Sequence, residues 1–541
     1  MFKYFEARGL RKLIGDDLLS KIENVLPVLD KDLDEYGLQR KKILADIFRS
    51  FIDAKTFKKK EFRRKFYNRL PEEIIDDLID RLNQNPNNAV FEEKVNYLVN
   101  TKWDDNEETR KVVDYLNLSE AFIPAKRVKR DSIEYLPKAD REFKTLKEFQ
   151  SKVYFEAVKD VEAFQRFIIQ MPTGSGKTRT SMEIISNEFK KREKTVVIWL
   201  AHSTELCEQA IACFKEVWQH IGNKNVNICR AFGSHNPLEG LPKESAFIVG
   251  GFQKLYSLYK NDEKVFDDFI ERVSLIIVDE SHKVLAPTYK ELTKKITYSN
   301  ACLIGLTATP GRSQDDIFQN KKLAEFFFNK KFTIDKKGYS SVIQYLKAID
   351  VLAYVNFESL TTSSKIKLNK KQLSHIKNKF DFPPGFLKKL GEDQIRNVEI
   401  LQELIEYLKQ GRQTLYFATS LDQSKFINSV LTYFGFNSCH IDGSTDKGTR
   451  EGNIKAFKDE EIQVICNYGV LTTGFDAPQT DLVFIARPTS SIILYSQMIG
   501  RGLRGPAIGG TEECTVCTVK DNIEGLPEEN KIYEYFDEYF D

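Results

Sequence analysis

Long apolar runs and an excess of charge of one sign are both missing from this chain of 541 residues. No uninterrupted apolar stretch is long enough to span a bilayer, so a membrane protein is not expected. The first residues, Met1 to Glu6, lack the apolar core of a signal peptide. The formal net charge is only +2. Any surface that binds nucleic acid must therefore be a local patch, because the molecule as a whole is no polycation.

Clustered metal ligands are also missing, although the chain has eight cysteines and six histidines. Most cysteines stand inside apolar segments, as Cys302 and Cys466 do, which indicates reduced, buried thiols in a cytoplasmic protein. Cys514 and Cys517 form a single CxxC pair. A structural zinc site would need two more ligands nearby. We therefore expect this pair to lie in a β-strand.

The length predicts several domains, and the spacing of apolar residues differs between two parts of the chain. Residues 1–125 carry apolar side chains at helical spacing, for instance Ile43, Ile47 and Phe51, which predicts a helical accessory domain. Residues 126–144 are polar and basic and are interpreted as a linker. From residue 145, short apolar strands alternate with amphipathic helices, the pattern of a parallel sheet with helical crossovers.

This alternating pattern runs through the chain twice. It predicts an α/β protein with two tandem parallel-sheet domains, 145–340 and 341–520. A lysine-rich segment, 361–391, contains Pro383-Pro384 and is interpreted as an insertion or loop on the second domain. Residues 521–541 are predicted to be an acidic C-terminal tail. The expected strands are 167–169, 196–201, 246–249, 275–279 and 302–306 in the first domain, and 414–417, 438–441, 462–466, 482–485 and 514–518 in the second.

A glycine-bearing loop predicts a nucleotide site. Met171-Pro-Thr-Gly-Ser-Gly-Lys-Thr178 follows an apolar strand and precedes a helical stretch. Backbone N–H groups and a helix N-terminus then face the phosphates, and Lys177 reaches the outer ones. The loop departs from the usual pattern because Met171 stands where a first glycine is common.

A pair of carboxylates, Asp279 and Glu280, ends a second apolar strand. Such carboxylates can hold Mg²⁺ and orient a water molecule, so the two motifs together predict a site for ATP and Mg²⁺. Taken alone, the pair fits an ordinary helix cap after a strand equally well.

The order of further motifs resembles that of superfamily 2 helicases and translocases of the DExH type, over roughly 70% of the chain. The texture is most similar to that of type III restriction subunits and excision-repair translocases. The matching segments are Leu146–Gln150, Met171–Thr178, Trp199–Leu206, Gly250–Gln253, Asp279–His282, Leu306–Thr309, Tyr416–Ser420, Val470–Ala477 and Gln497–Arg504.

The resemblance implies two RecA-like domains with ATP between them. Lys177 would pair with the β- and γ-phosphates, Thr178 and Asp279 would hold Mg²⁺, and Glu280 would activate the attacking water. Arg501 and Arg504 would reach across the cleft to the γ-phosphate, a contribution on the order of 10³ or more in rate. Further expected nucleotide contacts are Gln150 at the adenine, with Pro172, Thr173, Gly174, Ser175, Gly176, Gly474 and Asp476.

Other residues would contact nucleic acid or couple it to hydrolysis. His282 and Gln497 would link hydrolysis to the grip on the strand. The remaining expected contacts are His202, Ser203, Gly251, Gln253, Thr307, Thr309, Thr419, Thr472 and Thr473. Taken without the other motifs, Thr307 and Thr309 read better as turn formers before Pro310.

A basic stretch, Lys55 to Arg69, leaves two interpretations open. Phe62, Phe66 and Leu70 share one helical face, so the stretch fits a solvated helix with that face in a core. It also fits an accessory helix that follows nucleic-acid phosphates.

The sequence therefore predicts an ATP-driven motor on nucleic acid, with DNA favoured over RNA and no membrane role. Unwinding and duplex translocation both stay open. A second hypothesis is a nucleic-acid sensor that uses ATP to license a protein effector such as a nuclease, as in antiviral defence. A third is an ATPase with no nucleic-acid role.

Overall fold

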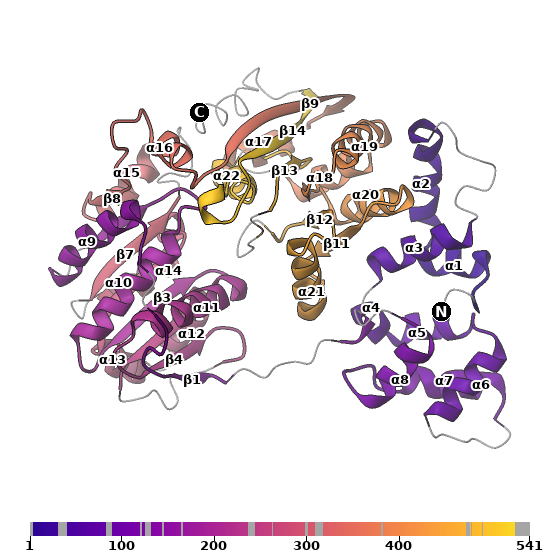
Figure 1. Ribbon diagram of the computed structural model, residues 1–541, viewed down its shortest axis with the longest axis horizontal. Helices are drawn as coiled ribbons and strands as arrows, with labels where there is room; N and C mark the ends of the chain where they lie inside the picture. Colours follow the sequence, from indigo (N-terminus) through magenta and orange to yellow (C-terminus); the bar gives the residue numbers. More distant parts are fainter. Residues whose placement is uncertain are drawn as a thin grey trace.

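The computed structural model describes residues 4–30, 40–52, 54–82, 89–118, 122–124, 131–142, 145–163, 166–235, 244–261, 263–297, 301–308, 317–379, 382–471, 477, 479–489 and 491–524. Within these ranges the chain forms a helical N-terminal domain and two α/β domains, each with its own sheet (Figure 1). The predicted fold class is confirmed.

The N-terminal domain is helical throughout its described part. Apolar residues three and four apart, such as Leu44, Ile47 and Phe48, are buried, which explains why these segments fold as helices only when they pack together. Phe66 and Leu70 of the basic stretch are buried as well, and Phe62 is partly buried. The helices are α1 Ala7–Ile14, α2 Asp16–Leu29, α3 Lys41–Phe51, α4 Ala54–Lys58, α5 Lys60–Tyr67, α6 Glu72–Arg81, α7 Phe91–Asn100 and α8 Glu107–Tyr115.

The first sheet has the strand order β1-β4-β5-β3-β6-β7-β2-β8. Its neighbours are parallel except for β1, which is antiparallel to β4. Its central strands are entirely buried and rich in β-branched residues, as expected for a sheet covered on both faces. The strands are β1 Ile133–Leu136, β2 Arg166–Gln170, β3 Val196–Ala201, β4 Val226–Ala231, β5 Ala246–Gly251, β6 Val273–Val278, β7 Cys302–Thr307 and β8 Lys331–Thr333.

Helices cover this sheet on both faces (Figure 1). They are α9 Glu148–Glu162, α10 Lys177–Lys191, α11 Thr204–Ile221, α12 Phe252–Asn261, α13 Glu263–Ile270, α14 Pro287–Thr297 and α15 Ile317–Phe326.

The second sheet has the order β11-β12-β10-β13-β14-β9, and every neighbouring pair is parallel. Its strands are β9 Tyr354–Lys367, β10 Thr414–Phe417, β11 Ser438–Asp442, β12 Val464–Tyr468, β13 Leu482–Ile485 and β14 Glu513–Glu524. Its helices are α16 Val342–Ala348, α17 Lys370–Lys379, α18 Pro384–Glu392, α19 Gln394–Lys409, α20 Leu421–Tyr433, α21 Lys447–Lys458 and α22 Ile492–Ile499.

Three predicted segments differ from the structure. The predicted linker contains β1, which joins the first sheet. The predicted insertion 361–391 begins within β9, a long edge strand paired with β14, and continues into α17 and α18. The predicted tail begins inside β14, because that strand runs through residue 520 to Glu524. Strands β4 and β8 were not predicted.

The helical domain packs on the second sheet domain rather than on the first. Helices α2 and α3 contact α19 and α20 (Figure 1). One apolar cluster unites both parts, with Ile22 and Phe48 from one side and Leu404 and Val430 from the other. The side-chain amide of Asn428 donates to the carbonyl of Ser50 at 3.1 Å. The N-terminal and second sheet domains therefore share a core.

Among the described residues, no helix combines the length and the apolar character needed to cross a membrane.

Candidate active site

The loop between β2 and α10 is shaped by two glycines. Gly174 and Gly176 both have φ of +85°, a left-handed conformation that residues with a Cβ rarely adopt. A Cβ on Gly176 would also lie 2.1 Å from Nε2 of Gln150. Helix α10 begins directly afterwards, at Lys177. A tight glycine loop that opens into a helix N-terminus suits a phosphate group.

Contacts from neighbouring segments hold this loop in place. The Met171 amide donates to the carbonyl of Thr307, at the end of β7, at 3.2 Å. The Ser175 hydroxyl donates to the carbonyl of Pro172 at 2.7 Å. Gln150 is buried, accepts a hydrogen bond from the Lys147 amide and donates to the Ser175 carbonyl, each at 3.0 Å. Gln150 therefore holds the loop in place. The second hydrogen of its side-chain amide is the one that it could donate to a nucleotide base.

Asp279 and Glu280 follow β6 at the same edge of the sheet as the glycine loop. Burial, together with the neighbouring charge of Glu280, raises the pKa of Asp279 to about 6. Burial acts to raise the pKa of Glu280, but the positive charges of Lys177, His282, Lys283 and His202 together outweigh it, so the net shift is downward. The Lys177 ammonium is thus close enough to act on both carboxylates. Oxygen donors of this kind, with the hydroxyl of Thr178, fit Mg²⁺.

The backbone of Glu280 is unusual. Its φ of +53° places a non-glycine residue in the left-handed region. Such strain is concentrated at functional sites, where the surrounding structure enforces it. His282 lies just beyond, with Nδ1 3.4 Å from Oε2 of Glu280, and its side chain is almost fully buried.

The second sheet domain completes this site. Gln497, on α22, donates from Nε2 to Oε1 of Glu280 at 3.3 Å. Gly500 lies against the glycine loop so closely that a Cβ there would stand 2.4 Å from Cγ2 of Thr173. A Cβ on Gly174 would lie 3.8 Å from Cγ of Arg504. The loop, the carboxylates and the segment 497–504 therefore meet at the seam between the two domains.

Arg501 and Arg504 belong to that segment. Arg501 donates from Nε to the carbonyl of Gln497 at 3.3 Å. The backbone of Arg504 forms a bridge with Leu352, which ties it to the segment that leads into β9. Sequence reasoning missed Lys147, which donates across the same seam to the carbonyl of Ala507 at 3.0 Å.

The expected nucleic-acid contacts on the first domain differ in how exposed they are. Ser203 caps α11 by accepting from the Leu206 amide at 3.3 Å, and Gln253 is exposed at the start of α12. His202 is partly buried, and burial lowers its pKa. Gly251 ends β5, and Thr307 is fully buried at the end of β7.

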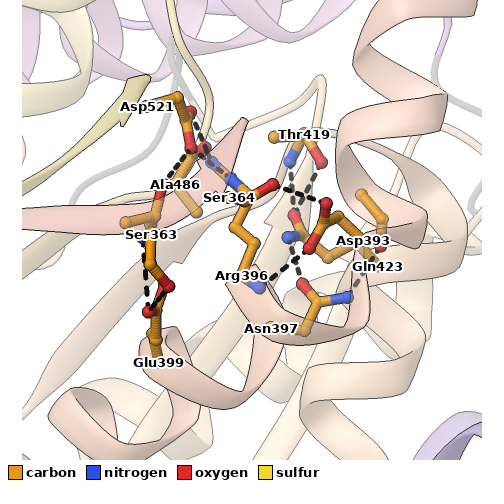
Figure 2. Close-up of polar contacts among 12 residues, drawn as sticks. Ser363, Ser364, Asp393, Arg396, Asn397, Glu399, Thr419, Gln423, Ala486 and Asp521 are labelled. Carbon is orange, nitrogen blue, oxygen red and sulfur yellow. Dashed lines mark hydrogen bonds and ion pairs between the residues drawn. The ribbon is translucent and has the colours of Figure 1, made fainter. Parts of the chain in front are cut away.

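Thr419, an expected contact on the second domain, is fully buried. Its amide and hydroxyl both donate to Oε1 of Gln423 at 2.8 Å, and Gln423 donates to Asn397 at 2.8 Å. Figure 2 shows Thr419 inside this polar network, which continues to Arg396. Thr419 therefore shapes the loop after β10 from inside the domain.

Five expected site residues lie outside the described residues. They are Thr309, Thr472, Thr473, Gly474 and Asp476.

One further contact between the two sheet domains had no signal in the sequence. Arg450, on α21, lies 3.5 Å from the Glu205 carboxylate on α11 and donates to the carbonyl of Asp442 at 3.0 Å. Only the folded arrangement brings these helices together.

The fold and this site define a class: ATPases with two RecA-like domains whose nucleotide site lies between them. Residues 141–312 match the family described as type III restriction enzyme, res subunit, and residues 396–505 match the helicase conserved C-terminal domain.

Comparisons with individual proteins also find similarity to helicases. A 51.5 kDa protein of Lactococcus phage (isolate 7-9) is 25% identical over 337 residues, covering 62% of each chain. IRC3 of Saccharomyces cerevisiae, named as a candidate ATP-dependent helicase, is 28% identical over 375 residues, covering 66% of this chain and 49% of its own. The chain thus spans less than two thirds of either relative. The structure of the helicase MrfA bound to DNA has a TM-score of 0.51 at 16% identity, covering 76% of this chain and 54% of that one.

One match falls on each sheet domain, so the chain resembles superfamily 2 helicases and type III restriction subunits over these two segments. The matched domains are those of ATP-dependent helicase enzymes.

Proposed function

We propose that this protein is an ATP-driven motor that moves along nucleic acid, with DNA favoured over RNA. The observation that carries the proposal is the contact of Gln497 with Glu280 across the seam. A catalytic carboxylate held from both domains is positioned correctly only when the domains are closed. Closure is therefore coupled to hydrolysis, and repeated closure produces movement when each domain grips a strand.

Each residue of the site has a distinct role in this proposal. Lys177 and the helix N-terminus at α10 hold the outer phosphates of ATP. Thr178 and Asp279 hold Mg²⁺, which when bound neutralises phosphate charge. Glu280 accepts the proton of the attacking water. Although burial opposes it, the surrounding positive charges, Lys177 foremost, lower its pKa and favour the carboxylate form that this role needs.

The arginines act from the opposite side of the seam. Arg504 lies beside the glycine loop, and Arg501 stands three residues earlier in the same segment, so both can stabilise charge on the γ-phosphate. Because this charge develops in the transition state, we expect Arg504→Ala to slow hydrolysis more than it weakens ATP binding.

The preference for DNA is supported by restriction relatives. Besides the family match over 141–312, the EcoAI endonuclease subunit of the type I restriction enzyme from Escherichia coli is 25% identical over 367 residues, covering 63% of this chain and 41% of its own. The same relatives support the second candidate, an ATP-switched subunit that translocates or clamps nucleic acid for a protein effector without unwinding it.

One experiment tests the proposal directly. The ATPase rate is measured with single-stranded and double-stranded DNA and RNA side by side, and Lys177→Ala serves as the inactive control. We expect DNA to stimulate wild-type turnover more than RNA does. Turnover indifferent to every nucleic acid would refute a nucleic-acid motor.

Strand displacement separates the two candidates. Release of an annealed, labelled strand that depends on ATP supports a helicase. DNA-stimulated turnover without release, together with a co-purifying effector, supports the clamping subunit.

A further inference from the structure

A cavity of about 570 Å³ lies between the helical domain and the second sheet domain. One wall comes from the end of α3, from α4 and from Lys59, which precedes α5. The other comes from α20, the edge strand β11 and the segment that follows it into α21. Both walls are held together by the shared core, and Lys55 donates across the gap to the carbonyl of Ser444 at 2.9 Å. The cavity is therefore formed by the packing of these two domains against each other.

The charged side chains of the lining are predominantly positive. Arg49, Lys55 and Lys59 come from the helical domain and are exposed, and Lys425 faces them from α20. The carboxylate in the lining, Asp442, accepts hydrogen bonds from the Thr445 amide at 2.9 Å and from Nε2 of His440 at 3.0 Å. Its negative charge is thus engaged within its own strand and turn. Thr56, Ser444 and Thr449 also line the cavity.

The position of the cavity relative to the sheet is informative. Because the strands are parallel, the carboxyl ends of β10, β12 and β11 lie along one edge, and ligands of open α/β sheets bind outside such ends. Ser444, Thr445 and Thr449 of the lining follow the carboxyl end of β11, whereas Ser438 and Cys439 lie at the start of that strand. The cavity therefore runs along the edge strand β11 and reaches the carboxyl edge of the sheet.

The volume of the cavity suits one nucleic-acid strand rather than a double helix. Ligand cavities of about 300–1,000 Å³ enclose small molecules, so about 570 Å³ has room for a short stretch of sugar and phosphate but not for a double helix. Lysines from two walls match the spaced charges of such a backbone.

We propose that the seam between the helical domain and the second sheet domain binds the phosphate backbone of a single nucleic-acid strand. This inference rests on the proposed function and adds to it a third gripping surface. Since the helical domain shares a core with the second sheet domain, the grip moves with that domain during each closure.

The test neutralises one lysine from each wall. Binding of a fluorescein-labelled oligothymidylate to the full chain is measured by anisotropy over a range of salt concentrations. For single strands, the slope of log K against log salt is about −0.7 for each phosphate contact. The double variant Lys59→Gln/Lys425→Gln should therefore lose about 1.4 from the magnitude of this slope. Lys12→Gln, on α1 of the same domain and away from the cavity lining, should keep the wild-type slope.

The ATPase assay separates failure of the inference from failure of the proposed function. If oligothymidylate stimulates wild-type turnover but the double variant keeps the wild-type slope, the seam is not a strand site and the motor proposal stands. If wild-type turnover does not respond to any nucleic acid, the motor proposal itself fails. A loss confined to blunt duplex, or to a polyglutamate peptide, would assign the seam to a double helix or to an acidic protein and overturn the inference. Matching thermal midpoints of the variants show that the fold is intact.

Discussion

At the scale of single residues, Glu280 is the side chain on which the chemistry depends. Removing its charge in Glu280→Gln keeps the shape and leaves an oxygen that Gln497 can still contact, but a neutral amide accepts no proton from water. We expect turnover to fall by about 10²-fold or more while ATP stays bound. Steady-state ATPase rates and binding of a fluorescent ATP analogue measure the two quantities.

The control is Glu291→Gln, an exposed glutamate on α14 whose partners are Tyr256 and Lys260. It should turn over as the wild type does. Normal turnover in Glu280→Gln as well would remove Glu280 from the role of base.

Gly500 tests whether the seam must close tightly. Its φ of −55° suits any residue, and within its own domain the added Cβ would approach only the Ser496 carbonyl oxygen closely, at 2.9 Å. The added methyl group would nevertheless stand 2.4 Å from Cγ2 of Thr173 and would push the two domains apart. Because a misplacement of about 1 Å can cost 10²-fold, we expect a large fall in kcat with little change in thermal stability. The kcat is measured at saturating ATP and nucleic acid.

Gly385→Ala is the matched control, since no atom lies within 4 Å of a Cβ at that position on α18. A kcat for Gly500→Ala equal to that of this control would mean that the observed approach of the domains is not needed for hydrolysis.

At the scale of elements, a buried ion pair joins α19 to β14. Arg396 donates from Nε to Oδ1 of Asp521 at 2.6 Å and from Nη2 to Oδ2 at 3.0 Å, and neither side chain is appreciably exposed (Figure 2). Arg396 also donates to the carbonyl of Ala486, at the end of β13. Arg396 therefore links β14 and the end of β13 to the helix that carries part of the network around Thr419.

Asp521→Asn should leave the Arg396 charge buried without its counterion. Breaking such a pair costs about 3 kcal/mol or more, which in a domain of 150–250 residues lowers Tm by about 6–12 °C. Differential scanning calorimetry checks this, with Asp422→Asn, an exposed position on α20, as the control. An equal Tm for the two variants would show that the ion pair contributes nothing net.

The elements also show how far sequence reasoning reaches. Strands with continuous Val, Ile and Leu, such as β3 and β6, were predicted because burial on both faces leaves a plain apolar run. Strand β9 was missed because its polar half, from Thr361 onward, has the composition of a loop. Its pairing with β14 depends on residues about 150 positions away. The predicted end of strand β14 was too early for the same reason, since the partner of Asp521 is Arg396, 125 positions away in the sequence.

The site follows the same rule. Lys177 and Glu280 stand in local motifs and could be predicted from sequence order, whereas no local pattern showed that Thr419 is buried. Burial of a threonine by Gln423 depends on how α19 and α20 pack. Likewise, the pairing of Glu205 with Arg450 depends on the approach of two domains, which local patterns do not encode.

At the scale of the whole molecule, the shared core makes a mechanical prediction. Helices α2 and α3 pack on α19 and α20, and Tyr433 donates to Asp30 across the same contact at 3.1 Å. The helical domain should therefore move as one body with the second sheet domain when ATP closes the seam. The first sheet domain should move relative to both.

Energy transfer between paired fluorophores measures this motion. Cysteines replace exposed residues in a Cys213→Ser background, which suits labelling because the other seven native cysteines are buried. A pair at Glu73 and Glu406 reports the helical domain against the second sheet domain, and a pair at Glu73 and Glu271 reports it against the first. Adding a non-hydrolysable ATP analogue with oligothymidylate should change the transfer efficiency of the second pair only. A change in the first pair would mean that the helical domain detaches during closure, and a strand held in the seam would then be released rather than carried forward.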